Sequence, residues 1–424
     1  MTDRRQVAHL LRRLTFGPTS AEVDAAVRAG PDATLAALLR PAGPVAGLPS
    51  AADPVAALGP DASREDRQRA RRDQRDQVNA AIRWWLGRMA GGGAAEKLVF
   101  FWHGHWATSV RKVRSAPLML AQQQTFRRYG TGDTGPLVRA MLRDPALILW
   151  LDGQKNTRKA PNENLAREVM ELFTLGVGAY SEDDVKAGAR VLTGWQVDRA
   201  AGTAGLVARR HDDRPVTLLG RTGTFDADSY ADLLVRHEAH LPFLVQRLWV
   251  RYGSGTAPPA DVTARVVTAG RDTTALLAAV CRDPGFAGTR GALVKQPVEW
   301  LIGAVRQLGV PMTGLSIEEQ QQLVNALRAL GQVPLRPPSV GGWPVGAAWL
   351  TTSSTLARLR AGQRLAALAP AAADRLTGAD RLEALADLLV VDGWSDRTRD
   401  ALREVRQPRR LLALGLASPE YAVH

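Results

Sequence analysis

The stretch from Asn162 to Trp195, NENLAREVMELFTLGVGAYSEDDVKAGARVLTGW, is the most informative guide to the fold. Its first half mixes polar residues with Leu, Val, Met and Phe at helical spacing. The apolar side of such a helix must be buried, so its polar side faces either solvent or an internal pocket. In a pocket, an Arg beside several carboxylates would supply a metal or acid/base site. At 3.6 residues per turn, one face carries Asn164, Arg167, Glu168, Glu171 and Thr174.

Helical periodicity extends along most of the chain, and we predict an all-α fold, a large multi-helix globular body. Capping signals support several helix starts. Thr19 and Glu22 have the spacing of a capping box, and Ser181 is followed by three acidic residues. The predicted helices span residues 3–15, 19–29, 31–39, 63–90, 94–109, 115–129, 135–142, 161–175, 181–194, 227–236, 240–252, 259–268, 272–282, 292–308, 316–330, 353–368, 379–390 and 394–404.

Patterns typical of β-strands are scarce. Residues 205–210 and 216–219 could form one short hairpin around His211, within an irregular or β insertion at residues 203–222.

We predict that residues 1–424 form a single helical domain. Residues 41–62, rich in Pro, Ala and Gly, are predicted to form a loop. The run REDRQRARRDQRD, from Arg64 to Asp76, begins the long charged helix predicted at 63–90. Its closely spaced mixed charges indicate a solvated helix.

Six sequence blocks occur in order: HLLRRLTFGPTSAEVDAA, FWHGHWATS, the stretch quoted first, RRHDDRPVTLLG, LVKQPVEWLIGAVRQLG and RPPSVGGWPVGAAWL. Together they resemble the bacterial "domain of unknown function 1800" family over nearly the whole chain. The resemblance implies no established activity. It suggests a partner from the "domain of unknown function 1501" family, which is often encoded beside relatives. One departure is that Leu241 separates His240 from Pro242, where relatives tend to have His followed directly by Pro.

Composition narrows the functional classes. The chain of 424 residues carries a net charge of +13, but only six of its 55 basic residues are Lys. Abundant Ala, Arg, Gly and Pro are the usual imprint of a GC-rich genome. Nucleic-acid binding is not expected, because no zinc finger, basic-region zipper or RNA-binding aromatic motif is present. An anionic surface or an acidic substrate stays open.

Several cofactors and locations are disfavoured. The single Cys281 excludes Cys-rich zinc and iron–sulfur sites, and no C-x-x-C-H motif is present for covalent haem c. No G-x-S-x-G, H-E-x-x-H or dinucleotide fingerprint occurs, so we expect no nucleotide cofactor. The N-terminus predicts an amphipathic helix and not a signal peptide, and no apolar stretch is long enough to cross a membrane. A cytoplasmic location is the default, with export alongside a signal-bearing partner as the alternative.

Two of the seven histidines, His103 and His105, stand among aromatic residues in FWHGHW. Residues i and i+2 of a regular helix project about 200° apart, so one ion could bind both only if the backbone opened at Gly104. We take His103 as a candidate catalytic residue, and both histidines with Glu171 as candidate metal ligands. The alternative is that both are core histidines hydrogen-bonded to carbonyl groups.

Glu168 and Glu171 have the i, i+3 spacing that helical bundles use for metal ligands, and both are candidate catalytic residues. Arg167 and Asn164 are candidate substrate-binding residues. The alternative is a structural network, because buried carboxylates must be paired and Arg167 would compete with a metal ion.

His211 and Asp212 are a third catalytic candidate, since a His–Asp pair can ligate a metal or act as a base with its orienting group. With His103 and the Glu-bearing helix, three segments then supply metal-ligand side chains. A His/carboxylate set without Cys suits Zn, Mn or non-haem Fe.

Two later blocks supply further candidate substrate-binding residues. Lys295 lies one turn before Glu299, and an ion pair between them is the simpler interpretation. The loop RPPSVGGWPVGAAWL lacks any helical or strand period, so Trp343 either locks it by packing or forms a pocket wall. Arg358, on the next helix, is a candidate anion contact.

The leading hypothesis is an enzyme with a buried His/carboxylate site that binds a divalent metal or uses acid/base groups, with Arg167 or Arg358 holding an anionic substrate. The alternative is a helical binding or assembly protein that works with a co-encoded partner. The enzyme site would gather His103, His105, Glu163, Glu168, Glu171, His211 and Asp212.

Overall fold

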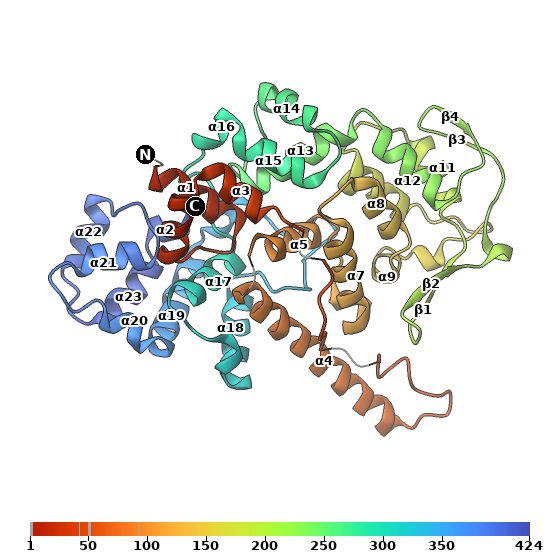
Figure 1. Cartoon of the computed structure of the whole chain (residues 1–424). Helices are drawn as coiled ribbons and strands as arrows, with labels where there is room; N and C mark the ends of the chain where they lie inside the picture. Colours follow the sequence, from red (N-terminus) through yellow and green to blue (C-terminus); the bar gives the residue numbers. More distant parts are fainter. Residues whose placement is uncertain (1–2, 42, 50–51, 92) are drawn as a thin grey trace.

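The predicted all-α class is confirmed by a computed structural model of the chain, which describes residues 3–41, 43–49, 52–91 and 93–424. Within these ranges the chain forms 24 α-helices, several short 3-10 turns, one π-helical segment and four strands in two hairpins (Figure 1). None of the described helices combines the length and apolar composition that a membrane span needs.

The α-helices follow one another along the chain with the following bounds: α1 (Arg4–Leu14), α2 (Ser20–Ala29), α3 (Pro31–Leu38), α4 (Arg64–Gly91), α5 (Ala94–His105), α6 (Val110–Val113), α7 (Ala116–Tyr129), α8 (Thr134–Leu142), α9 (Pro145–Trp150), α10 (Asn164–Glu168), α11 (Glu182–Val191), α12 (Ala227–Arg236), α13 (His240–Tyr252), α14 (Ala260–Val266), α15 (Thr273–Arg282), α16 (Pro284–Ala287), α17 (Pro297–Gln307), α18 (Ile317–Ala329), α19 (Thr352–Leu368), α20 (Pro370–Asp374), α21 (Arg381–Leu388), α22 (Asp396–Arg403), α23 (Pro408–Leu416) and α24 (Pro419–Ala422).

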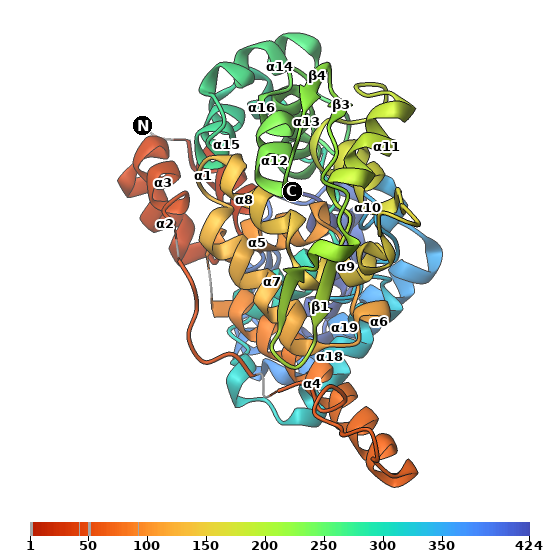
Figure 2. The same cartoon turned by 90° about the vertical axis from the view of Figure 1, so that its right-hand side faces the viewer.

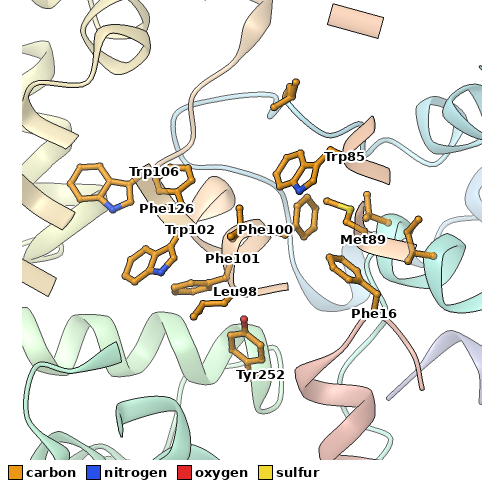
Figure 3. Packing of buried hydrophobic residues seen from close by; sticks show 14 of the residues in the cluster. Phe16, Trp85, Met89, Leu98, Phe100, Phe101, Trp102, Trp106, Phe126 and Tyr252 are labelled. Carbon is orange, nitrogen blue, oxygen red and sulfur yellow. The ribbon is translucent and has the colours of Figure 1, made fainter. Parts of the chain in front are cut away.

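Helix α5 lies at the centre of the molecule and is buried on almost every side. Its aromatic residues point in several directions, so it contacts neighbours all round and not along a single stripe (Figure 3). Phe100 packs against Trp85 of α4, while Phe101 packs against Tyr252 of α13. The apolar cluster around α5 extends from Leu10 to Tyr421. The core therefore joins segments from both ends of the described chain.

The β insertion is built differently from the predicted single hairpin. Strands β1 (Trp195–Asp198) and β2 (Thr203–Leu206) pair antiparallel, and β3 (Val216–Leu218) pairs separately with β4 (Arg221–Gly223). The predicted pairing of residues 205–210 with 216–219 is therefore wrong. Each strand instead closes on its nearest neighbour through a short turn, which costs less chain entropy than a longer loop.

The predicted loop at residues 41–62 contains no helix or strand among its described residues; positions 42, 50 and 51 lie outside them. The predicted charged helix at 63–90 is confirmed as α4. Its first turns extend away from the body in both views (Figures 1 and 2). Buried side chains begin at Ala70 and continue to Met89, so only the second part of α4 joins the core.

Candidate functional site

The segment that carries the predicted polar stripe is not one α-helix. Helix α10 ends at Glu168, and Val169–Thr174 form a π-helical segment, η2. Its wider turns bring the N–H of Leu175 2.8 Å from the carbonyl oxygen of Met170, and the Thr174 hydroxyl donates to the carbonyl of Val169 at 2.6 Å. The predicted helix 161–175 is therefore wrong beyond Glu168. An α-helical face cannot be extended through residues 169–174, because π-helical bonds run from i to i+5.

The polar residues of this segment separate toward different partners. Arg167 forms ion pairs with Glu163 at 3.0 Å and with Glu182 at 2.7 Å. The side-chain amide of Asn164 donates to the Leu151 carbonyl at 3.1 Å. Arg167 is thus held by carboxylates, and Asn164 by the backbone. Their proposed role in substrate binding stays a prediction, to which these contacts give no support.

His103 holds a loop in place. The backbone N–H of Leu335 donates to its Nε2 at 3.1 Å, and the rings of Trp85 and Trp343 pack on it. Leu335 has a φ of 65°, a left-handed conformation that costs energy for a Leu. Burial lowers the pKa of His103 to about 3, so the imidazole is neutral at pH 7. His103 is thus a buried core histidine, but it accepts from a backbone N–H and does not bond to a carbonyl group as the alternative supposed. A catalytic role stays a prediction.

His105 lies on another side of α5. Its Nε2 is 2.9 Å from the carbonyl oxygen of Phe173, and because a carbonyl only accepts, Nε2 carries the hydrogen. Burial, and next the positive charge of Arg247, lower the pKa of His105 to about 3. The other ring nitrogen, Nδ1, is buried and has no described hydrogen-bond partner.

The two histidines predicted as metal ligands lie on one unbroken helix. Helix α5 continues through Gly104 to His105, so the backbone does not open between the two histidines. Within the described ranges, no three His, Cys, Asp or Glu side chains lie together in a group that could hold a metal. A metal bound by His103, His105 and Glu171 stays a prediction from the sequence, and we derive no chemistry through it.

The His211–Asp212 pair is part of an ion-pair cluster. Asp212 is buried and contacts Arg190 at 2.9 Å and Arg214 at 2.8 Å. Hydrogen bonds from Arg214 and Arg190 hold the pKa of Asp212 well below its usual value. The Nδ1 of His211 donates to the carbonyl of Thr193 at 2.9 Å. The Asp212 carboxylate is therefore held by arginines and the His211 ring by Thr193. Their catalytic role stays a prediction.

Lys295 and Glu299 do not form the ion pair that their spacing suggests. Glu299 is fully buried and pairs with Lys97 at 2.7 Å and with Arg251 at 2.9 Å. The ammonium of Lys295 lies 3.6 Å from the ring centroid of Tyr421. Lys295 precedes α17, where the backbone has not begun to turn helically, so the i, i+4 geometry is absent.

The Pro/Gly/Trp loop forms one wall of a hollow. The Trp343 ring lies 5.5 Å from that of Phe100, centroid to centroid. Arg358 is 3% exposed and donates to the Trp349 carbonyl at 3.1 Å, which ties the loop to α19. Trp343 therefore lines a possible binding site, whereas Arg358 has a structural contact. A substrate role for either one, or for Lys295, stays a prediction.

Two arginines that the sequence analysis did not single out lie at this hollow. Its volume is about 160 Å³, and its apolar walls include Phe100, Phe101 and Trp343. Arg247 and Arg251 also line it, one turn apart on α13. The Nη1 of Arg251 donates a hydrogen bond to Glu299, whereas its Nη2 is buried without a partner in the described structure. The hollow therefore combines aromatic walls with unsatisfied positive charge, and we call it the aromatic pocket.

A wider groove of about 800 Å³ adjoins the aromatic pocket through Arg247, which lines both. The groove is also lined by Glu171, whose Oε2 accepts a hydrogen bond from the Tyr180 hydroxyl at 2.6 Å. Burial, and next the charge of Glu171, raise the pKa of the neighbouring Glu168 carboxyl. Of the predicted residues, Trp343 and His105 thus line the pocket, and Glu171 lines the groove.

Sequence patterns gave only a weak signal for Arg247 and Arg251. In HLPFLVQRLWVRY, basic residues near a helix C-terminus are the ordinary complement to the helix dipole, and a solvated face is the default interpretation. The useful signal is that these arginines repeat every four residues between large apolar side chains. Such a pattern places charge at the border of a core, where it needs a counter-ion.

Comparison with known proteins places the chain in a family. A family model described as "Protein of unknown function (DUF1800)" matches residues 9–423. No curated protein and no solved structure matches the chain. Because the family model covers nearly the whole sequence, the chain belongs to the DUF1800 family, whose function is not established.

Proposed function

We propose that the protein binds a small organic anion, with the anionic group at Arg247 and a flat apolar group in the aromatic pocket. The observation that carries this proposal is the guanidinium of Arg247, which has no ion pair or hydrogen bond within the described residues although burial lowers its pKa. A partly buried cation without a counter-ion is costly. An anionic ligand would supply that counter-ion.

The chemistry of the pocket favours a carboxylate with an apolar ring. A guanidinium presents two parallel N–H groups that match the two oxygens of a carboxylate. Phe100, Phe101 and Trp343 offer ring surfaces for stacking. At about 160 Å³ the pocket is smaller than the usual range for drug-sized ligands, about 300–1,000 Å³, so it suits a single ring or one end of a longer molecule.

Benzoate is a suitable probe, and Arg247→Gln is expected to weaken its binding between about tenfold and 100-fold, the value of a charged hydrogen bond. Isothermal titration calorimetry measures the affinity, with a change in the protein's tryptophan fluorescence as a second readout. Benzamide, which has the same shape without the charge, should bind the wild-type protein more weakly.

The matched control is Arg236→Gln, an exposed arginine at the end of α12 that lines neither hollow. It should leave benzoate affinity unchanged within about twofold, because a distant exposed charge is screened by salt. Equal binding of benzoate and benzamide, or an undiminished affinity in Arg247→Gln, would contradict the proposal.

A second candidate function is acid/base catalysis in the groove, favoured by the position of Glu171. The Tyr180 hydroxyl orients its carboxylate, and Arg247 lines the same groove. Such a carboxylate can act as a general base on a substrate anchored at Arg247, a role typically worth about 10²–10⁴ in rate.

If the protein is an enzyme of this kind, Glu171→Gln lowers turnover about 100-fold or more while benzoate binding is retained. The measurement is a hydrolysis screen over small esters that carry an aryl carboxylate. Glu238→Gln, at an exposed position outside the groove, is the control. Turnover that survives in Glu171→Gln rules this candidate out and leaves ligand binding. A co-encoded partner of the "domain of unknown function 1501" family stays a prediction.

A further inference from the structure

A third hollow, separate from the aromatic pocket, is lined mainly by arginine. It has a volume of about 270 Å³ and lies where α4 meets α6 and the loop after α18. We call it the arginine hollow. Its lining includes no acidic side chain, and its five basic residues are Arg71, Arg75, Arg111, Arg114 and Arg336.

The positive charges of the arginine hollow are not neutralised by the protein. None of the five guanidinium groups forms an ion pair or donates a side-chain hydrogen bond within the part of the chain that the structure describes. Arg336 is half-buried and its Nε is completely enclosed without a partner. Burial, and next the charges of Arg328 and Arg111, lower its pKa. The hollow thus holds like charges together at an energetic cost that an anion would remove.

Asp53, which is bonded to one residue of the lining, already has a cationic partner. Asp53 is 2% exposed and pairs with Arg199 at 3.0 Å. It also accepts a hydrogen bond from Gln74, which lines the hollow, at 3.2 Å. Arg199 in turn donates to the carbonyl of Arg114 at 3.1 Å. This chain of contacts fixes one wall of the hollow and pairs the Asp53 carboxylate with Arg199, so that it does not form an ion pair with the lining arginines.

The opposite wall is fixed by the loop that His103 holds. Leu335 is clamped at both backbone groups, since its N–H donates to His103 and its carbonyl accepts from Val110 at 2.9 Å. Val110 begins α6, one residue before Arg111. The clamp therefore holds the backbone that carries Arg336 beside the backbone that carries Arg111 before any ligand arrives. A binding site whose groups are already placed loses less conformational entropy on binding.

We propose that the arginine hollow binds a compact polyanion that carries two or more phosphoryl groups. Several guanidinium groups around one small space call for a ligand with several negative charges, and phosphoryl oxygens match the guanidinium fork. The volume admits a small molecule, and the lining offers no aromatic ring on which a nucleobase could stack. A free diphosphate and the diphosphate end of a larger metabolite share this chemistry.

Titration calorimetry of the full chain with inorganic pyrophosphate tests the proposal at about 0.15 M salt, where long-range surface attraction is screened. The wild-type protein should bind one equivalent, and more tightly than orthophosphate or sulfate. Arg111→Gln and Arg336→Gln should each weaken binding at least about tenfold, the loss of one charge-assisted contact. Arg111 is exposed and its side chain has no described partner, so its replacement should leave folding intact even if Arg336→Gln does not.

The matched control is Arg72→Gln, which removes the same charge from the same helix beside Arg71 but outside the hollow. It should retain pyrophosphate affinity within about twofold. A parallel titration with ADP distinguishes a free diphosphate from the diphosphate end of a larger metabolite. If ADP binds as tightly as pyrophosphate, the ligand is the diphosphate end of a nucleotide; if only pyrophosphate binds, the ligand is a free diphosphate.

Three results overturn the proposal: no pyrophosphate binding, an equal loss in Arg72→Gln, or tighter binding of a single-stranded oligonucleotide than of pyrophosphate. The last result would indicate a nucleic-acid surface.

Discussion

Replacing Glu299 with Gln is expected to lower the free energy of unfolding by about 3–5 kcal/mol, the usual cost of removing one partner from a buried ion pair. The Glu299 carboxylate is fully buried between Lys97 and Arg251, with the Nε2 of His424 at 3.5 Å. Burial alone would raise the pKa of Glu299, but the charges of Arg251 and Lys97 hold it well below its usual value. Glutamine keeps the shape of the side chain and removes the charge that these cations need.

Urea unfolding followed by circular dichroism measures the effect. The dependence of the unfolding free energy on urea concentration must be the same in the wild-type and variant proteins before their midpoints are compared. Glu318→Gln is the matched control, because Glu318 is exposed in the first turn of α18 and has no described ion pair. Its effect should stay within about 0.5 kcal/mol. A Glu299→Gln protein as stable as the control would show that the cluster is not a stabilising counter-ion network.

Acidification from pH 6.5 to pH 5 is expected to destabilise the protein through its buried histidines. The folded-state pKa values of His9, His103 and His105 are lowered to about 3, and that of His240 to about 4, with burial as the largest cause. Below about pH 6.5 the unfolded chain binds protons that the folded protein does not, so stability is lost as the pH falls. One pH unit corresponds to 1.36 kcal/mol per group, so each histidine contributes roughly 2 kcal/mol over this range.

Protonation of Asp144 changes the stability in the opposite direction to that of the histidines. Burial raises its pKa to about 6, so the folded protein itself takes up a proton below that pH and gains stability relative to the unfolded chain. The histidines outnumber it, and the net slope should be positive with pH. Unfolding free energies at pH 7.5, 6 and 5 measure the slope of stability against pH. The His103→Gln variant should lose the part of this slope that corresponds to uptake of about one proton on unfolding. Stability that does not change over this range, or a slope unaffected by His103→Gln, would contradict the assignment.

Most helices were predictable because their signals are local. The capping boxes of Thr19 with Glu22 and of Ser181 with Asp184 are both present, and the α-helices begin one residue after each cap. Periodicity and capping depend on residues within one or two turns, so the sequence alone records them.

Helix α23 was missed, because no helix was predicted beyond residue 404. In the structure a Cβ at Gly415 would lie 2.8 Å from Leu385, so the glycine allows close packing.

The candidate site was only partly predictable. Trp343, His105 and Glu171 were identified because aromatic, His and Glu side chains are unusual in their local patterns. The aromatic pocket also needs Arg247, and the arginine hollow needs Arg336 beside Arg111. These residues come together only through contacts between segments that are far apart in the chain, and the periodicity of the sequence does not encode such contacts. The predicted convergence of His103 with the Glu-bearing helix depends on contacts of the same kind and stays a prediction.

The π-helical segment η2 has an evolutionary consequence. A π-helical turn amounts to one residue inserted into an α-helix. Deleting a single codon between Val169 and Thr174 would remove that extra residue and return the segment to a regular α-helix, with the residues on either side kept in their present orientation. Such a deletion would change which side chain occupies the place of Glu171 in the groove without disturbing the distant core. One mutational step can therefore exchange the chemistry of the groove while the scaffold is kept.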